Sequence, residues 1–106
     1  MKASRPFDVT RNKVLQDPEA AALYLEECLQ DGNMALFTAA LKHVAEARGG
    51  VGSLSKQTRL NREALYRTLS EEGNPRLDTL AKILDALGLR LGVAPAGRPS
   101  RHGHPA

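Results

Sequence analysis

The sequence predicts a small all-α fold with five helices. Leu and Ala dominate the apolar residues, and aromatic residues make up only 4% of the chain, whereas sandwiches and barrels use more aromatic and β-branched side chains. Apolar residues also recur at helical spacing in successive segments, and capping residues, glycines or prolines bound each segment. The 106 residues suit one compact domain.

The first helix is expected from Pro18 to Gln30, after an irregular N-terminal arm over residues 1–16. Asp17 suits the N-cap, Pro18 suits the first helical position, and Gly32 stops the helix. Four apolar residues could anchor part of the arm: Phe7, Val9, Val14 and Leu15. The buried face of the helix is expected to hold Ala21, Tyr24, Leu25, Cys28 and Leu29.

A second helix is expected over residues 34–48, with Asn33 as its cap and the glycines at 49 and 50 as its stop. A short third helix fits residues 53–58, where Ser53 follows a glycine-rich stretch and can serve as the cap. The second helix has the longer buried stripe, formed by Phe37, Ala40, Leu41, Val44 and Ala45.

A fourth helix is expected over residues 61–70, with Asn61 as its cap, after a break at Arg59-Leu60. A loop over residues 71–75 leads to a fifth helix over residues 77–87, which Gly88 ends. Its apolar stripe consists of Leu77, Leu80, Ile83, Leu84 and Leu87. The alternation over residues 89–93 suggests a short strand, which needs the N-terminal segment or a symmetry mate as partner.

The composition of the chain also indicates the state of its C-terminal tail and its location in the cell. Residues 94–106 have no large apolar side chain and several prolines and glycines, so this tail is expected to be disordered. No apolar run approaches the roughly 20 residues that span a bilayer, and the first residues lack the apolar core of a secretion signal. A single Cys excludes an internal disulfide framework. The expected location is the cytoplasm, associated with the nucleoid.

Nothing in the sequence predicts an enzyme, a metal site or a cofactor. No Ser-His-Asp arrangement, phosphate-binding glycine loop or paired carboxylate pocket is present, and the glycine run at residues 49–52 lacks the Lys-Ser/Thr of a P-loop. Cys28 lies on an apolar helical face and is expected to be a small buried hydrophobe. His43 has no Cys or His at ligand spacing, and His102 and His104 lie in the tail.

Residues 53–69, SLSKQTRLNREALYRTL, predict a helix-turn-helix. Leu54, Leu60 and Leu65 are placed to anchor two short helices that meet across a turn of a few residues. In this motif the second helix enters the major groove and presents its N-terminal residues to base edges. The residues expected to point outward are Asn61, Arg62, Glu63, Tyr66 and Arg67.

The basic residues of the chain gather at this motif. Residues 53–67 carry four basic side chains and one acidic one, a net charge of +3, whereas residues 1–48 carry six basic and seven acidic ones, a net charge of −1. Arg can bind guanine through two hydrogen bonds, and Glu63 could accept from cytosine or hold Arg67. The expected DNA-binding residues are Ser53, Lys56, Gln57, Asn61, Arg62, Glu63, Tyr66, Arg67 and Arg76.

The stretch LSKQTRLNREALYRTLSEEGNPRLDTLAKILDALGLRL resembles the Cro/repressor (XRE) helix-turn-helix domain, which has a λ-repressor-like fold. On that resemblance, residues 17–93 are the helical domain. The chain is similar, more closely, to addiction-module antidote proteins, the HigA-like antitoxins, through NREALYRTLSEEGNPRLDTL and the two helices upstream. The resemblance implies a homodimer that binds palindromic operator DNA, represses its own operon and neutralises a RelE/ParE-like toxin.

Four positions depart from the family pattern, and one of them, Asn61 where Ser is common, still suits a helix cap. Arg59 stands in the turn where the fold usually has Gly, Ser55 where Ala is usual, and Thr68 where Ala or a larger apolar residue is usual. Acidic side chains of the first helix could meet a basic toxin: Glu19, Glu26, Glu27 and Asp31. Two alternatives remain open, a stand-alone XRE-family regulator without a toxin and an adaptor that uses the fold only for protein contacts.

Overall fold

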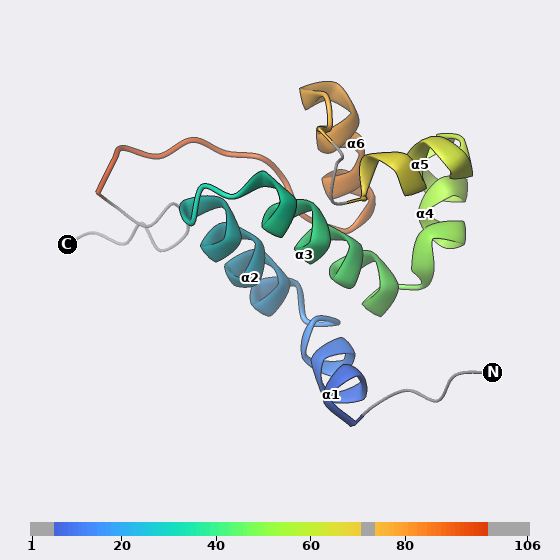
Figure 1. The fold of residues 1–106 in the computed structure, drawn as a ribbon, viewed down its shortest axis with the longest axis horizontal. Coiled ribbons are helices and arrows are strands. Elements are labelled where there is room, and N and C mark those ends of the chain that lie inside the picture. Colours follow the sequence, from blue (N-terminus) through green and yellow to red (C-terminus); the bar gives the residue numbers. More distant parts are fainter. Residues whose placement is uncertain (1–5, 71–73, 98–106) are drawn as a thin grey trace.

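The computed structural model describes residues 6–70 and 74–97, with side chains from Thr10 onward, and these residues form an all-helical fold (Figure 1). The described part of the chain holds six helices and no strand, which confirms the all-α prediction. Their bounds are α1 Pro6–Val14, α2 Pro18–Gln30, α3 Met34–Ala47, α4 Gly50–Thr58, α5 Arg62–Thr68 and α6 Leu77–Ala86.

Helix α3 is the centre of the core. It packs against α1, α2 and α4, and Figure 1 shows it running between α2 and α4. Its stripe is buried as the sequence predicts, with Leu41 and Val44 fully excluded from solvent. Helix α4 in turn contacts both α5 and α6, so the second half of the chain is attached to α3 through α4.

Helix α1 corrects the prediction of an irregular arm over residues 1–16. Pro6 opens this helix, a position that suits proline, and Arg11 and Lys13 lie in its last turn, where cations interact favourably with the helix dipole. Leu15 follows the helix and is buried in the core, whereas Val14 is exposed. Because α1 has one short apolar edge and docks on α3, its own sequence carries little periodic signal.

Three predicted N-caps form as expected. Asp17 Oδ2 accepts a hydrogen bond from the Ala20 N–H at 3.1 Å, and Asn33 Oδ1 accepts one from the Leu36 N–H at 3.2 Å. Asn61 Oδ1 accepts from two backbone N–H groups, of Glu63 at 2.7 Å and Ala64 at 3.2 Å. Side-chain caps therefore fix the starts of α2, α3 and α5.

Two leucines of the predicted stripes are exposed, so their assignment to the core is wrong. Leu29 in the last turn of α2 is 48% exposed, and Leu77 at the first position of α6 is 71% exposed. Both have the right spacing but lie at a helix end, where the neighbouring helix no longer covers them. The apolar spacing predicts which side of the helix a residue faces, but it does not predict whether another helix covers that residue.

The segment after α6 is extended but unpaired. Gly88 has φ +79° and ends the helix as predicted, and the Leu89 N–H donates to the Leu84 carbonyl at 2.8 Å. No strand forms over residues 89–93 in the described chain, so the predicted short strand is absent, consistent with its need for a partner. Residues 71–73 of the predicted loop and residues 98–106 of the predicted tail lie outside the described residues.

Candidate nucleic-acid interface

Helices α4 and α5 meet across the turn at Arg59 to Asn61, as the helix-turn-helix prediction requires. Helix α4 starts at Gly50 with Gly49 as its N-cap at φ +113°, so the prediction that Ser53 caps this helix is wrong. Ser53 lies inside α4 instead, and its Oγ accepts a hydrogen bond from Gln57 Nε2 at 3.3 Å. The glycine run that looked like a loop therefore supplies the first turn of the helix.

Hydrogen bonds from two side chains hold the turn between α4 and α5. Ser55 Oγ donates to the Leu60 carbonyl at 2.6 Å. Thr58 Oγ1 donates to the Leu54 carbonyl at 2.8 Å and accepts from the Leu60 N–H at 3.2 Å. Ser55, a departure from the family pattern, thus stabilises the junction by bonding across it.

Helix α5 is anchored by very little buried surface. Within it only Leu65 is buried, and it is fully excluded from solvent; Leu69 just beyond the helix is also buried. The predicted anchor Leu54 is buried in α4, and Leu60 is half-buried against the core. All five residues predicted to point outward are exposed: Asn61, Arg62, Glu63, Tyr66 and Arg67.

Arg62 packs against Gly52, a contact that the spacing of the motif does not predict. A Cβ atom at Gly52 would lie 3.7 Å from Arg62 Nη2 and 3.8 Å from Cζ, which is ordinary van der Waals contact. The guanidinium therefore lies beside α4 while the arginine stays exposed, and a methyl group at position 52 would fit next to it. Gly52 lies just before the helix predicted over residues 53–58, so no periodic signal predicts this contact.

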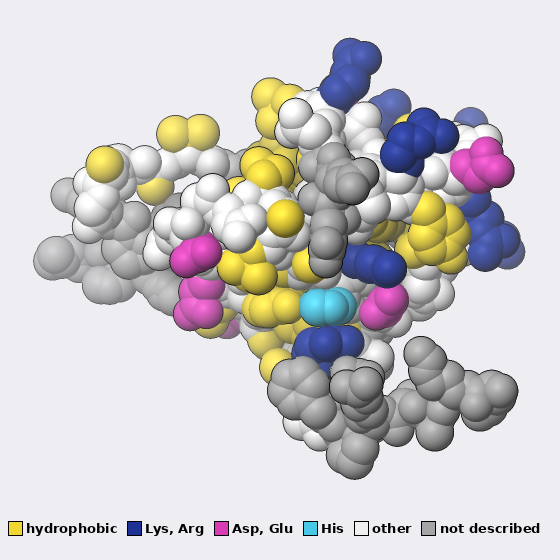
Figure 2. All heavy atoms as spheres, viewed as in Figure 1, with side chains coloured by type: hydrophobic (Ala, Val, Ile, Leu, Met, Phe, Trp, Pro, Cys, Tyr) yellow, Lys and Arg dark blue, Asp and Glu magenta, His cyan; other side chains and the backbone are white. Residues whose placement is uncertain are grey.

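Two other residues predicted to bind DNA, Lys56 and Gln57, are exposed on α4, the helix next to α5. Figure 2 shows Lys and Arg side chains gathered over the side that α5 occupies in Figure 1. Glu63 makes no ion pair with Arg67 among the described residues, so it remains available to an outside donor. The sequence-level placement of these side chains on one basic side is consistent with the structure.

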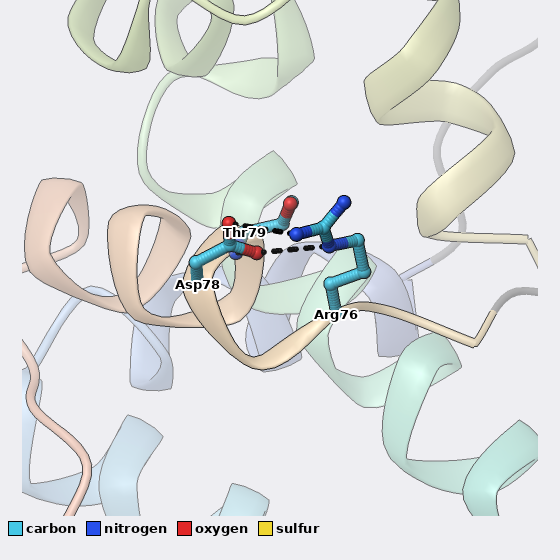
Figure 3. Close-up of polar contacts among 3 residues, drawn as sticks. All are labelled: Arg76, Asp78 and Thr79. Atoms are coloured by element: carbon cyan, nitrogen blue, oxygen red, sulfur yellow. Dashed lines mark hydrogen bonds and ion pairs between the residues drawn. The ribbon is translucent and has the colours of Figure 1, made fainter.

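Arg76 is partly neutralised by a neighbouring carboxylate. Its Nε lies 3.3 Å from Asp78 Oδ1 and its Nη2 lies 3.4 Å from Asp78 Oδ2, and Asp78 also accepts from the Thr79 N–H at 2.7 Å (Figure 3). Both side chains are mostly exposed, so this pair contributes little to stability. The carboxylate nevertheless partly balances the positive charge of Arg76, whereas no ion pair of Lys56 occurs among the described residues.

The polar groups around α2 and α3 have structural roles. Tyr24 Oη and His43 Nδ1 are 2.8 Å apart in a hydrogen bond, and the two rings stack with centroids 6.3 Å apart. Burial raises the pKa of the Cys28 thiol, and the charges of Glu27 and Asp31 raise it further. Cys28 is a free, buried thiol, and no group of three or more metal-ligating side chains occurs among the described residues.

The acidic residues of α2 flank an exposed leucine. Glu19, Glu27 and Asp31 are exposed, Glu26 is half-buried and has an interaction within the chain, and Leu23 is 43% exposed. Glu27 and Asp31 are one helical turn apart and therefore share a side of the helix. We call Leu23, Glu27 and Asp31 the α2 face.

The six helices with an exposed α5 held on α4 define a small all-helical domain of the helix-turn-helix type. A family model described as "Probable addiction module antidote protein" matches residues 3–95. A protein of Haemophilus influenzae strain Rd, named only as an uncharacterized protein, is 37% identical over 89 residues, which cover 84% of this chain and 89% of that protein. The chain belongs to the family of addiction module antidote proteins.

No solved structure matches the chain. Among the described residues, no helix is both long enough and apolar enough to cross a membrane.

Proposed function

We propose that this protein is the antitoxin of a type II toxin-antitoxin module that binds operator DNA as a dimer, represses its own operon and neutralises a RelE/ParE-like toxin. Membership of the antidote family supports the antitoxin role. The observation that carries the DNA-binding role is α5, a helix with one buried residue and a polar outer side led by Asn61 and Arg62.

In this proposal the N-terminal end of α5 enters the major groove. Arg62 reads a guanine through two hydrogen bonds, and Glu63 accepts from a cytosine amino group. Tyr66, which is 49% exposed, and Arg67 lie one turn further along the same helix and contact the groove edge. The remaining contacts go to phosphates and come from four side chains: Ser53, Lys56, Gln57 and, more weakly, Arg76.

Dimerisation follows from the small size of the reading helix. One such helix covers few base pairs, whereas a two-fold pair reads two half-sites one DNA turn apart. The C-terminal segment over residues 87–93 and α6 are the proposed pairing surface, since Leu91 and Val93 are exposed there and Leu77 is exposed on α6. Leu87, at the start of that stretch, is buried in the core of its own chain and contributes no contact.

The α2 face is the proposed toxin contact, because it combines an exposed apolar side chain with carboxylates that suit a basic partner. The test is the double reversal Glu27→Lys and Asp31→Lys in a pull-down with the protein encoded by the neighbouring gene. Capture should fall at least tenfold, while Glu46→Lys on α3, an exposed residue, serves as the matched control. Unchanged capture would refute toxin binding by the α2 face.

A neighbouring gene that encodes no toxin would favour the alternative function, a stand-alone regulator.

The DNA role is tested by Arg62→Ala. Loss of a bidentate guanine contact should cost about 1–3 kcal/mol on the DNA upstream of the protein's own gene and leave the affinity for random DNA nearly unchanged. Lys13→Ala on α1 removes one positive charge from a different helix and is the matched control. Fluorescence anisotropy at fixed salt measures both affinities. An equal loss on both DNAs would reject Arg62 as a base reader.

A further inference from the structure

Arg59 is the one residue other than glycine with a positive φ in the described chain. Its backbone angles are φ +63° and ψ +20°, in the left-handed region that side chains with a Cβ rarely adopt. Glycine fits this position without strain. The arginine therefore occupies a site where glycine would make the fold more stable.

The shape of the turn does not depend on the arginine side chain. The Arg59 N–H donates to the Ser55 carbonyl at 2.8 Å, which is a backbone bond that any residue but proline makes. The hydroxyls of Ser55 and Thr58 tie the turn to Leu60 and Leu54, as described above. Because these bonds hold the left-handed conformation, the strain at residue 59 persists with no help from its guanidinium.

The guanidinium has no partner within the described residues. Arg59 is exposed, and no ion pair joins it to Glu63, the acidic residue four positions on. It lies between two other exposed cations, Lys56 on α4 and Arg62 on α5. These three exposed cations lie within seven residues of the sequence and form a basic stretch across the turn, which attracts an anion.

We propose that Arg59 binds a backbone phosphate of the DNA strand that borders the groove entered by α5. This inference rests on the proposed DNA binding and adds Arg59 to the proposed DNA contacts. A phosphate at this point would interact with the positive charge of Arg59 and with its exposed neighbours Lys56 and Arg62. The bonds of the turn hold the positive φ at residue 59, so an arginine there carries a backbone cost that a phosphate contact would offset.

The test compares Arg59→Gly with Arg59→Lys in the full chain. Glycine removes strain and charge together, so the melting temperature should rise while the affinity for DNA falls by a similar factor on upstream and random DNA. The slope of log affinity against log salt should decrease in magnitude by about one, as for the loss of one phosphate contact. Lysine keeps the charge and should retain the slope.

Two controls separate this inference from the proposed function. Lys13→Gln removes a charge from α1 and should leave the salt slope unchanged, and Arg59→Asn gives an uncharged side chain that tolerates a positive φ. Failure of the unmodified protein to bind its upstream DNA would overturn the proposed function and this inference with it. Binding by the unmodified protein, with Arg59→Gly and Arg59→Asn unchanged in affinity and slope, would overturn the Arg59 contact alone.

Discussion

Helices α3 and α5 are attached to the molecule in opposite ways. Seven of the 14 residues of α3 are buried, whereas one of the seven residues of α5 is buried. Helix α3 is held along its length by its neighbours, and α5 is held by Leu65, by the Asn61 cap and by the bonds across the preceding turn. A helix fixed at so few points leaves most of its side chains free for a partner.

The surfaces around α5 and at the end of α2 also differ, in the sign of their charges. The side chains around α5 are mainly basic, and acidic side chains lie at the end of α2, as Figure 2 shows for the visible face. The described chain thus has a basic side around α5 and acidic side chains on α2, which the proposed function assigns to DNA and to a protein partner. The predictions below test how firmly each region is held, beginning with the largest effect.

Leu65→Ala should give the largest loss of stability. Leu65 is fully buried and is the sole buried residue of α5, so truncation leaves a cavity and should cost about 2–5 kcal/mol. Chemical denaturation followed by circular dichroism measures the free energy of unfolding. Leu23→Ala, on the exposed side of α2, is the control and should change it by less than about 0.5 kcal/mol. A loss below about 1 kcal/mol for Leu65→Ala would contradict the anchoring of α5.

Removal of the two asparagine caps compares the helices directly. Asn61→Ala should cost about 1–2 kcal/mol, because its carboxamide accepts two backbone bonds at the start of a short helix. Asn33→Ala removes a single bond from the long, well-packed α3 and should cost about 0.5–1 kcal/mol. Denaturation midpoints at constant slope give both values. The reverse order would show that α5 does not depend on its ends.

Tyr24→Phe isolates one bond of the α2–α3 region. The variant deletes the hydroxyl that bonds to His43 and keeps the stacked ring, so it should cost about 1 kcal/mol. Tyr66→Phe makes the same chemical change on α5, where no partner of the hydroxyl is present among the described residues, and should leave stability unchanged. Thermal unfolding of the two variants in parallel provides the check. Equal effects would remove the structural role of the Tyr24–His43 pair.

The smallest expected effect is the pH dependence that Cys28 contributes. Burial raises the pKa of its thiol, so the folded chain holds this proton more tightly than the unfolded chain. The resulting stability is present below the unfolded thiol pKa and is lost as the pH rises through the folded value. Unfolding free energies at pH 7 and pH 10 should therefore fall less in Cys28→Ala than in the unmodified protein, both in a Tyr24→Phe background. An identical decline in the two proteins would contradict this assignment.

Elements with a cap at one end and a broad apolar face were predictable from the sequence. Asp17 and Asn33 mark the starts of α2 and α3, and the apolar spacing of α3 specifies its buried side. Helix α1 and the start of α4 at Gly50 were not predictable, because the first depends on docking against α3 and the second on glycine angles that the sequence does not reveal. Tertiary contacts decide such elements.

The candidate interface followed from the sequence in its outline and less so in its detail. The outward residues of α5 were identified, since a helix with one buried leucine leaves little choice for the rest. The contact of Arg62 with Gly52 and the pairing of Arg76 with Asp78 depend on side-chain positions in three dimensions. The prediction that Ser53 caps α4 was wrong, because the helix starts earlier, at Gly50, and Ser53 lies inside it.

The most direct test of the central claim is the affinity of the full-length protein for the DNA upstream of its own gene, compared with a scrambled sequence of equal length at physiological salt. The account predicts binding to the upstream DNA at least about 1,000-fold tighter than to the scrambled DNA, in the range of sequence-specific proteins. Equal affinities would contradict it, because α5 would then bind phosphates without reading bases.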